Sequence, residues 1–132
     1  MADSDKNNIY QNLIVWQKAM DLVEEMYRLI RTLPKEEMFA LANQMRRASV
    51  SVPSNIAEGA GRKTAPDFIH FLVVARGSVY EIETQLRICI RLGYFKENQA
   101  KMAFGLCKEI GKMLSALVSN LESKCDKLSS DI

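Results

Sequence analysis

Apolar residues recur at steps of three and four along four stretches of the chain, the spacing of amphipathic helices that pack together. The stretches cover Leu13 to Leu33, Glu36 through Pro53 to the glycines of AEGAG, Thr64 to Gly93, and Glu97 to Lys124. Pro34 ends the first, because a residue that precedes proline avoids the helical region. Four such helices with short connections predict an all-α, antiparallel up-down-up-down four-helix bundle.

The length of 132 residues predicts a single domain, and 48% hydrophobic with 26% charged residues is typical of globular proteins. We expect the bundle to occupy residues 11–125, between a disordered polar N-terminus at 1–10 and a frayed C-terminus at 126–132. The opening MADSDKNN lacks the apolar region of a signal peptide, and no run reaches the roughly 18 apolar residues of a membrane span. The prediction is a cytoplasmic protein.

The first helix carries two apolar rows. One contains Leu13, Trp16, Met20, Val23, Tyr27 and Ile30, and the other contains Val15, Ala19, Leu22, Met26 and Leu29. Together they cover roughly 200° of the circumference, more than one bundle core requires. The third helix also has an apolar row nearly opposite its core row. We expect a homo-oligomer whose interface contains Val15, Leu22, Met26, Leu29, Ile69, Val73 and Tyr80.

The segment Gln44–Arg62, QMRRASVSVPSNIAEGAGR, places many polar residues within an otherwise apolar helical pattern. The alternation over Ser49–Val52 could form a short strand, with Pro53 as the first residue of a new helix. The heptad residues before Pro53 and the NIAE run after it favour one helix that bends at Pro53. A lone short strand would also find no partner in this chain.

Three segments of the sequence are familiar: VWQKA from Val15, the segment Gln44–Arg62, and ARGSVYEIETQL from Ala75. From about Leu13 through the fourth helix, the chain closely resembles the four-helix-bundle family named for 23S rRNA intervening sequences. The resemblance implies a bundle that assembles as a ring, typically a pentamer. More distantly, the chain is similar to accessory variability determinants of diversity-generating retroelements. Those basic pentameric barrels work with a reverse transcriptase and its RNA, which makes an RNA or a nucleic-acid-processing protein a candidate partner.

Polar residues that match the family pattern predict a polar seam between the second and third helices. Arg47, Ser51, Ser54 and Glu58 follow one another at steps of four, three and four on one side of the helix. Facing the third helix, such residues could close a network of ion pairs and hydrogen bonds. We interpret this network as a structural lock, with a ligand site as the alternative. The predicted polar seam comprises Arg46, Arg47, Ser51, Ser54, Asn55, Glu58, Ser78 and Glu81.

The net charge of +2 is unevenly distributed, because residues 46–112 hold eleven basic and six acidic side chains. This imbalance favours an anionic partner for the middle of the chain. The candidate nucleic-acid contacts are Arg62, Lys63, Arg76, Arg87, Arg91, Lys101, Lys108 and Lys112. No exposed aromatic residue is expected among these cations, so base stacking has no obvious residue. The overall charge is also low beside the strongly basic distant relatives.

Candidate catalytic chemistry is sparse. His70 is the only histidine, and Glu81 and Glu83 lie two residues apart, so they point in different directions on a helix. The AEGAGRK glycines do not match a phosphate-binding loop. The three cysteines lack the spacing of metal ligands and are interpreted as small apolar residues: Cys89, Cys107 and Cys125. We therefore predict no catalytic, metal or cofactor site, and a ring-forming assembly or adaptor protein. RNA binding is the alternative.

Overall fold

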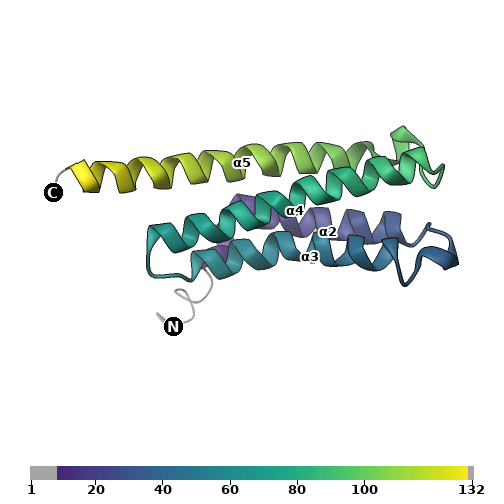
Figure 1. Ribbon diagram of the computed structural model, residues 1–132, viewed down its shortest axis with the longest axis horizontal. Coiled ribbons are helices and arrows are strands. Elements are labelled where there is room, and N and C mark those ends of the chain that lie inside the picture. The colour runs from purple at the N-terminus through teal and green to yellow at the C-terminus, as the bar shows by residue number, and fades with distance from the viewer. Residues whose placement is uncertain (1–8, 131–132) are drawn as a thin grey trace.

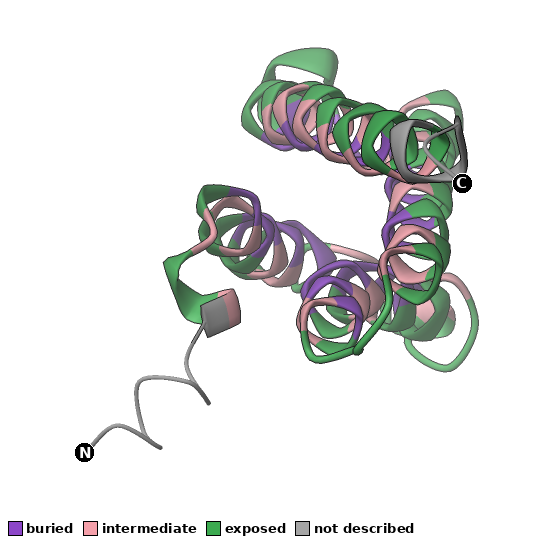
Figure 2. Cartoon of the chain, turned by 90° about the vertical axis from the view of Figure 1, so that its left-hand side faces the viewer, coloured by how far each residue is buried: buried purple, intermediate pink, exposed green. Residues whose placement is uncertain are grey.

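The computed structural model describes residues 9–130, with side chains from Tyr10 to Asp126 (Figure 1). The elements are η1 (Ile9–Asn12), α2 (Ile14–Ile30), η2 (Lys35–Glu37), α3 (Leu41–Ala60), α4 (Ala65–Arg91) and α5 (Glu97–Ser130). Each α-helix packs against its neighbour in the chain, and α5 closes the arrangement against α2. Viewed end-on, the buried side of each helix faces the others (Figure 2). The predicted all-α four-helix bundle is confirmed.

The predicted chain ends fall largely outside this range. Residues 1–8 and 131–132 lie outside the described residues. Ile9 and Tyr10, assigned to the disordered N-terminus, belong to the short helix η1. At the other end α5 continues to Ser130, beyond the predicted end at Lys124. Within residues 9–130, no helix combines the length and apolar content needed to cross a membrane.

The core side of α2 is the row that the sequence analysis assigned to another copy. Its members are almost fully buried inside the chain, at 4%, 0%, 0% and 1% exposure for Val15, Leu22, Met26 and Leu29. They have no surface left to offer a partner, so this part of the predicted interface is wrong. The other row contains Trp16 and Tyr27, whose polar atoms favour half-exposed positions, and these two side chains are only partly buried.

Helix α3 begins later than predicted. Lys35–Glu37 forms the short helix η2, and the exposed Phe39 separates it from the start of α3 at Leu41. Glu37 is held there because its carboxylate accepts a 3.1 Å hydrogen bond from the hydroxyl of Tyr94. From Leu41 the helix continues through Pro53 to Ala60, so the alternative with a short strand is wrong. The bend at Pro53 stays a prediction.

Both ends of α4 follow from local chemistry. The Thr64 hydroxyl accepts a hydrogen bond from the backbone N–H of Asp67 at 3.3 Å, which caps the first turn. At the far end Gly93 adopts a φ of 79°, a conformation that glycine reaches without steric cost. The backbone N–H of Tyr94 then donates to the Cys89 carbonyl at 2.9 Å, which terminates α4 and turns the chain toward α5.

Helix α5 carries two apolar rows that differ in burial. The larger residues of one row are only half-buried: Leu106, Met113, Leu117 and Leu121. The fully buried row consists of Ala100, Ala103, Cys107, Ile110, Leu114 and Val118. Small residues in its first turns let α5 approach α4 closely, while the larger leucines cover the edge of the core.

Candidate functional site

Three residues of the predicted polar seam form a hydrogen-bonded link between α3 and α4. The hydroxyls of Ser51 and Ser78 lie 2.8 Å apart. Asn55 donates from its side-chain amide to the Ser51 hydroxyl at 2.9 Å and to the Ser51 carbonyl at 2.8 Å. Ser78 also lies within reach of its own helix, 3.3 Å from the Val74 carbonyl. These polar groups therefore satisfy one another within the bundle.

The rest of the predicted seam does not join this link. Glu58 instead pairs with Arg62 at the end of the same helix, at 2.6 Å. Within the described part of the chain, no hydrogen bond or salt bridge involves the side chains of the other four seam residues: Arg46, Arg47, Ser54 and Glu81. Arg47, Ser54 and Glu81 are exposed, and the predicted closed ion-pair network is wrong.

Gly59 brings α3 and α4 together next to this link. A Cβ at this position would lie 2.8 Å from the Cβ of Phe71 and 2.9 Å from Cδ1 of Phe68. Both distances are shorter than carbon atoms tolerate, so only glycine fits without a shift of α4. The segment Gln44–Arg62 thus has a clear packing role.

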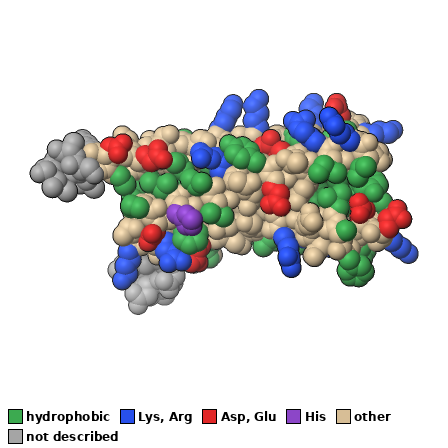
Figure 3. Space-filling view, in the orientation of Figure 1, with side chains coloured by type: hydrophobic (Ala, Val, Ile, Leu, Met, Phe, Trp, Pro, Cys, Tyr) green, Lys and Arg blue, Asp and Glu red, His purple; other side chains and the backbone are tan. Residues whose placement is uncertain are grey.

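A second charged region lies along α4 and α5, and we call it the basic face. Arg76 donates to the hydroxyl of Ser115 at 3.3 Å. The guanidinium carbon of Arg87 lies 4.9 Å from the ring centroid of Phe104 on α5. In Figure 3, Lys and Arg side chains project along the upper edge of the molecule, over α5. The basic face comprises Arg76, Arg87, Arg91, Lys101, Lys108 and Lys112.

Two of the predicted nucleic-acid contacts are not part of the basic face. Arg62 and Lys63 lie in the loop between α3 and α4, at the opposite end of the bundle from the loop between α4 and α5 (Figure 1). Arg62 is partly neutralised by Glu58, and its guanidinium carbon lies 4.8 Å from the ring centroid of Phe71. The structure therefore divides the predicted cations between two sites.

Phe104 is the residue that the sequence analysis missed. It is half-buried and contacts Arg87, so an aromatic ring accompanies these cations, although it is not an exposed one. The signal was present in the turn between α4 and α5. In an antiparallel pair, residues equally far from the connecting loop face each other, and Arg87 and Phe104 lie about equally far from Tyr94–Lys96.

Apart from the buried residues of α2, the predicted oligomer interface lies on α4. Val73 and Tyr80 are 41% and 57% exposed on α4, whereas Ile69 packs partly against the core. On the opposite side of the bundle, a groove of about 360 Å³ runs between α2 and α3. Its lining includes Trp16, Met20, Val23, Val50, Pro53 and Ala57.

Comparison with known proteins places these features in a family. A sequence model of the 23S rRNA-intervening sequence proteins matches residues 11–116. The chain belongs to this family. The structure is also similar to the crystal structure of a protein of unknown function from the S23 ribosomal protein family of Bacteroides thetaiotaomicron. The two share 25% identity with a TM-score of 0.74, over 80% of this chain and 98% of that one. No curated protein matches the chain.

The titratable groups of this intervening sequence protein are mostly at its surface. His70 is exposed beside the ring of Phe71. Burial raises the pKa of the Cys89 thiol to about 11, and it raises that of Cys107 to about 12. Both thiols stay protonated near neutral pH. Among the described residues, no three His, Cys, Asp or Glu side chains gather in a way that could hold a metal ion.

Proposed function

We propose that this intervening sequence protein is a non-catalytic assembly module whose bundles join side to side into a closed ring. The family resemblance implies five copies. The observation that supports the ring best is the presence of two separate apolar surfaces on one chain. One is the groove between α2 and α3, where Met20 and Val50 are 39% and 43% exposed, and the other is formed by Val73 and Tyr80 on α4.

Two different apolar surfaces favour a ring for a geometric reason. When surface one of a copy meets surface two of the next, the contact is head-to-tail, and a suitable rotation closes it into a ring. Aligned apolar side chains are also more stable when a partner covers them. In such a ring each α4 would contact the α2–α3 groove of its neighbour.

Light scattering on a sizing column tests this proposal directly. We expect the wild-type chain to elute as a multiple of its 15.0 kDa mass at micromolar concentration. Val73→Glu with Tyr80→Glu should give a folded monomer, because two carboxylates would be buried without partners in the contact. Met102→Glu is the matched control, since Met102 is 64% exposed on α5, outside both surfaces. A wild-type chain that remains a monomer overturns the proposal.

We infer RNA binding by the basic face as a second function. Its support is the combination of cations with an aromatic ring, because Phe104 can stack on an unpaired base while the lysines meet phosphates. Along α4 and α5, three carboxylates lie within four residues of these six cations: Glu83, Glu97 and Glu109. Glu109 pairs with Lys18 of α2, so the face keeps a net positive charge. A partner that processes nucleic acid, such as a reverse transcriptase, would share the same RNA.

The salt dependence of binding tests this second function. For a single-stranded RNA, replacing Lys101, Lys108 and Lys112 by alanine should reduce the slope of log affinity against log salt by roughly 2, since each phosphate contact contributes about 0.7. A charge-matched variant removes three exposed cations that are not among the candidate contacts: Arg31, Lys35 and Lys124. It should leave the slope nearly unchanged. Equal losses in the two variants would contradict a role for this particular face.

A further inference from the structure

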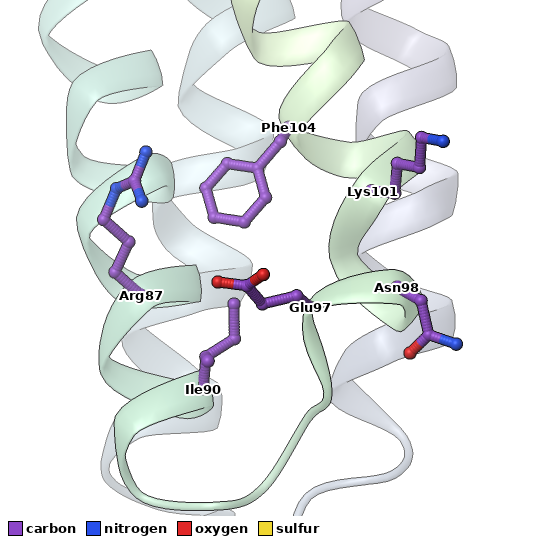
Figure 4. Close-up of a pocket in the computed structure, with 6 residues that line it drawn as sticks. All are labelled: Arg87, Ile90, Glu97, Asn98, Lys101 and Phe104. Carbon is purple, nitrogen blue, oxygen red and sulfur yellow. The ribbon is translucent and has the colours of Figure 1, made fainter.

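The end of the basic face beside the loop between α4 and α5 contains a pocket of about 440 Å³ (Figure 4). Pockets of this size commonly bind small organic molecules. Its lining residues come from both helices: Arg87 and Ile90 from α4, with Glu97, Asn98, Lys101 and Phe104 from α5. The pocket thus contains a cation, a carboxylate and an aromatic ring.

The wall formed by Phe104 suits a flat ligand. Its ring faces the space between the two helices, opposite the aliphatic side chain of Ile90 (Figure 4). The guanidinium carbon of Arg87 lies 4.9 Å from the ring centroid, which is a stacking position for a planar cation. A planar heterocycle could take this position on the ring, and Arg87 would then meet the edge of the heterocycle.

Glu97 determines which heterocycle can enter. In Figure 4 its carboxylate points into the space between α4 and α5. Within the described part of the chain it accepts no hydrogen bond and forms no salt bridge. An ionised carboxylate only accepts hydrogen bonds, so it favours a ligand with donors and disfavours a phosphate at the same place. Lys101 points away from this space, where it can meet a phosphate outside the pocket.

We propose that this pocket binds an unpaired guanine base. Guanine is the one standard base with two adjacent donors, N1–H and N2–H, that a single carboxylate can accept together. Its O6 and N7 are acceptors that suit the paired donors of an arginine. Glu97 would therefore bind N1–H and N2–H on the Watson–Crick edge, Arg87 the adjacent Hoogsteen edge, and Phe104 the face of the ring. Adenine and cytosine each donate only from an exocyclic amino group, and uracil only from N3–H.

This inference rests on the proposed binding of RNA, although a free guanine nucleotide offers the same base. The experiment is fluorescence anisotropy with labelled uridine octamers that carry one central guanosine, inosine or adenosine, at low salt. We expect guanosine to bind about tenfold more tightly than adenosine, with inosine between them because it lacks the N2 amino group. Glu97→Gln should remove this preference, since an amide offers only one acceptor atom on that side.

Matched controls separate the pocket from the face around it. Glu122→Gln changes an exposed carboxylate elsewhere on α5 and should keep the guanosine preference. Arg87→Lys retains the charge, so it should weaken the preference while leaving the salt slope unchanged. Circular dichroism spectra that match the wild type would establish that each variant is folded.

The outcomes distinguish this proposal from RNA binding itself. Salt-dependent binding that is equal for all three octamers would overturn the guanine pocket and leave RNA binding intact. If no octamer binds but guanosine monophosphate does, in a manner that needs Glu97, the pocket is supported and the RNA function fails. If neither binds, both proposals fail.

Discussion

The two sides of α4 are built in contrasting ways. Toward α3 it presents Ser78, which is hydrogen-bonded to Ser51, and the rings of Phe68 and Phe71, which lie close to Gly59 of α3. Toward α5 it presents long cationic side chains, one of which lies on Phe104. The first side uses its polar groups within the fold, and the second leaves charges in solvent. Polar residues of α4 thus serve packing on the side of α3, and they remain available for binding on the side of α5.

The contrast shows where to look for binding in such a bundle. The segment Gln44–Arg62 attracts attention because it is polar, but its Ser51 and Asn55 are already hydrogen-bonded to each other, and Ser51 also to Ser78. A ligand would have to break those hydrogen bonds to gain its own. Arg87 and Glu97 have only a ring contact or no partner in the described chain, so they can bind a ligand without that loss.

The largest expected effect is the loss of folding stability at alkaline pH. It compares two buried thiols, that of Cys89 on α4 and that of Cys107 on α5. The pKa values of Cys89 and Cys107 rise to about 11 and about 12 in the folded protein, above the ordinary 9.0. The folded state therefore keeps protons that the unfolded chain loses. Stability is complete below pH 9 and falls toward pH 11 to 12, by about 1.4 kcal/mol per pH unit for each thiol at most.

Urea unfolding between pH 8 and pH 11 measures this loss. Cys89→Ala and Cys107→Ala should each be less stable at pH 8 and show a shallower decline with pH, because one buried thiol is gone. A Cys107 variant that declines as steeply as the wild type would show that the inner surface between α4 and α5 is hydrated. The core between α4 and α5 would then differ from the dry core between α3 and α4.

Glycine substitutions compare the close side of α4 with its open side. Gly59→Ala should destabilise the protein by about 1–3 kcal/mol, because the new methyl group collides with Phe71. Gly77→Ala should stabilise it by roughly 0.5–1 kcal/mol, since a Cβ there meets nothing within 4 Å and alanine is the better helix former. Thermal unfolding of both variants gives the sign of each effect. A stabilising Gly59→Ala would mean that α3 and α4 can separate freely.

Double-mutant cycles should give the smallest effects. We expect a coupling of about 1 kcal/mol between Ser51 and Ser78, whose hydroxyls are partly buried at 2.8 Å. The longer contact of Arg76 with Ser115, at 3.3 Å, should couple by only a few tenths of a kcal/mol, because a hydrogen bond weakens as it lengthens. Chemical denaturation of the single and double alanine variants measures both values. The contrast between the two sides of α4 fails if the second coupling equals the first.

Much of the fold follows from the sequence, because the step of three and four residues and the caps at Thr64 and Gly93 are local signals. Local sequence does not determine which of the two apolar rows of α2 faces the core. Both rows are apolar, and only packing against α3 and α5 decides that Leu22 is buried while Trp16 is not. A pattern within one helix gives its apolar sides and cannot rank them.

The candidate site was harder to predict than the fold. The cations of the basic face were found from charge alone, but Phe104 gains its meaning from its position opposite Arg87. That pairing needs the antiparallel register of α4 and α5, which the turn at Gly93 sets. The predicted seam failed for a related reason. At about 100° per residue, Arg47 and Ser54 lie roughly 40° and 60° to one side of Ser51, and both are exposed to solvent.

The position of α4 between α3 and α5 also determines which helix can move. Its hydrogen bonds and close packing toward α3 fix α4 in the bundle, so sliding it would break the Ser51–Ser78 contact. Toward α5 the described side chains offer one weak hydrogen bond, from Arg76, and a flexible stacked arginine. Adjustment to a ligand therefore falls to α5. We therefore expect α4 to keep its position against α3 when the basic face binds a ligand, while α5 shifts relative to α4.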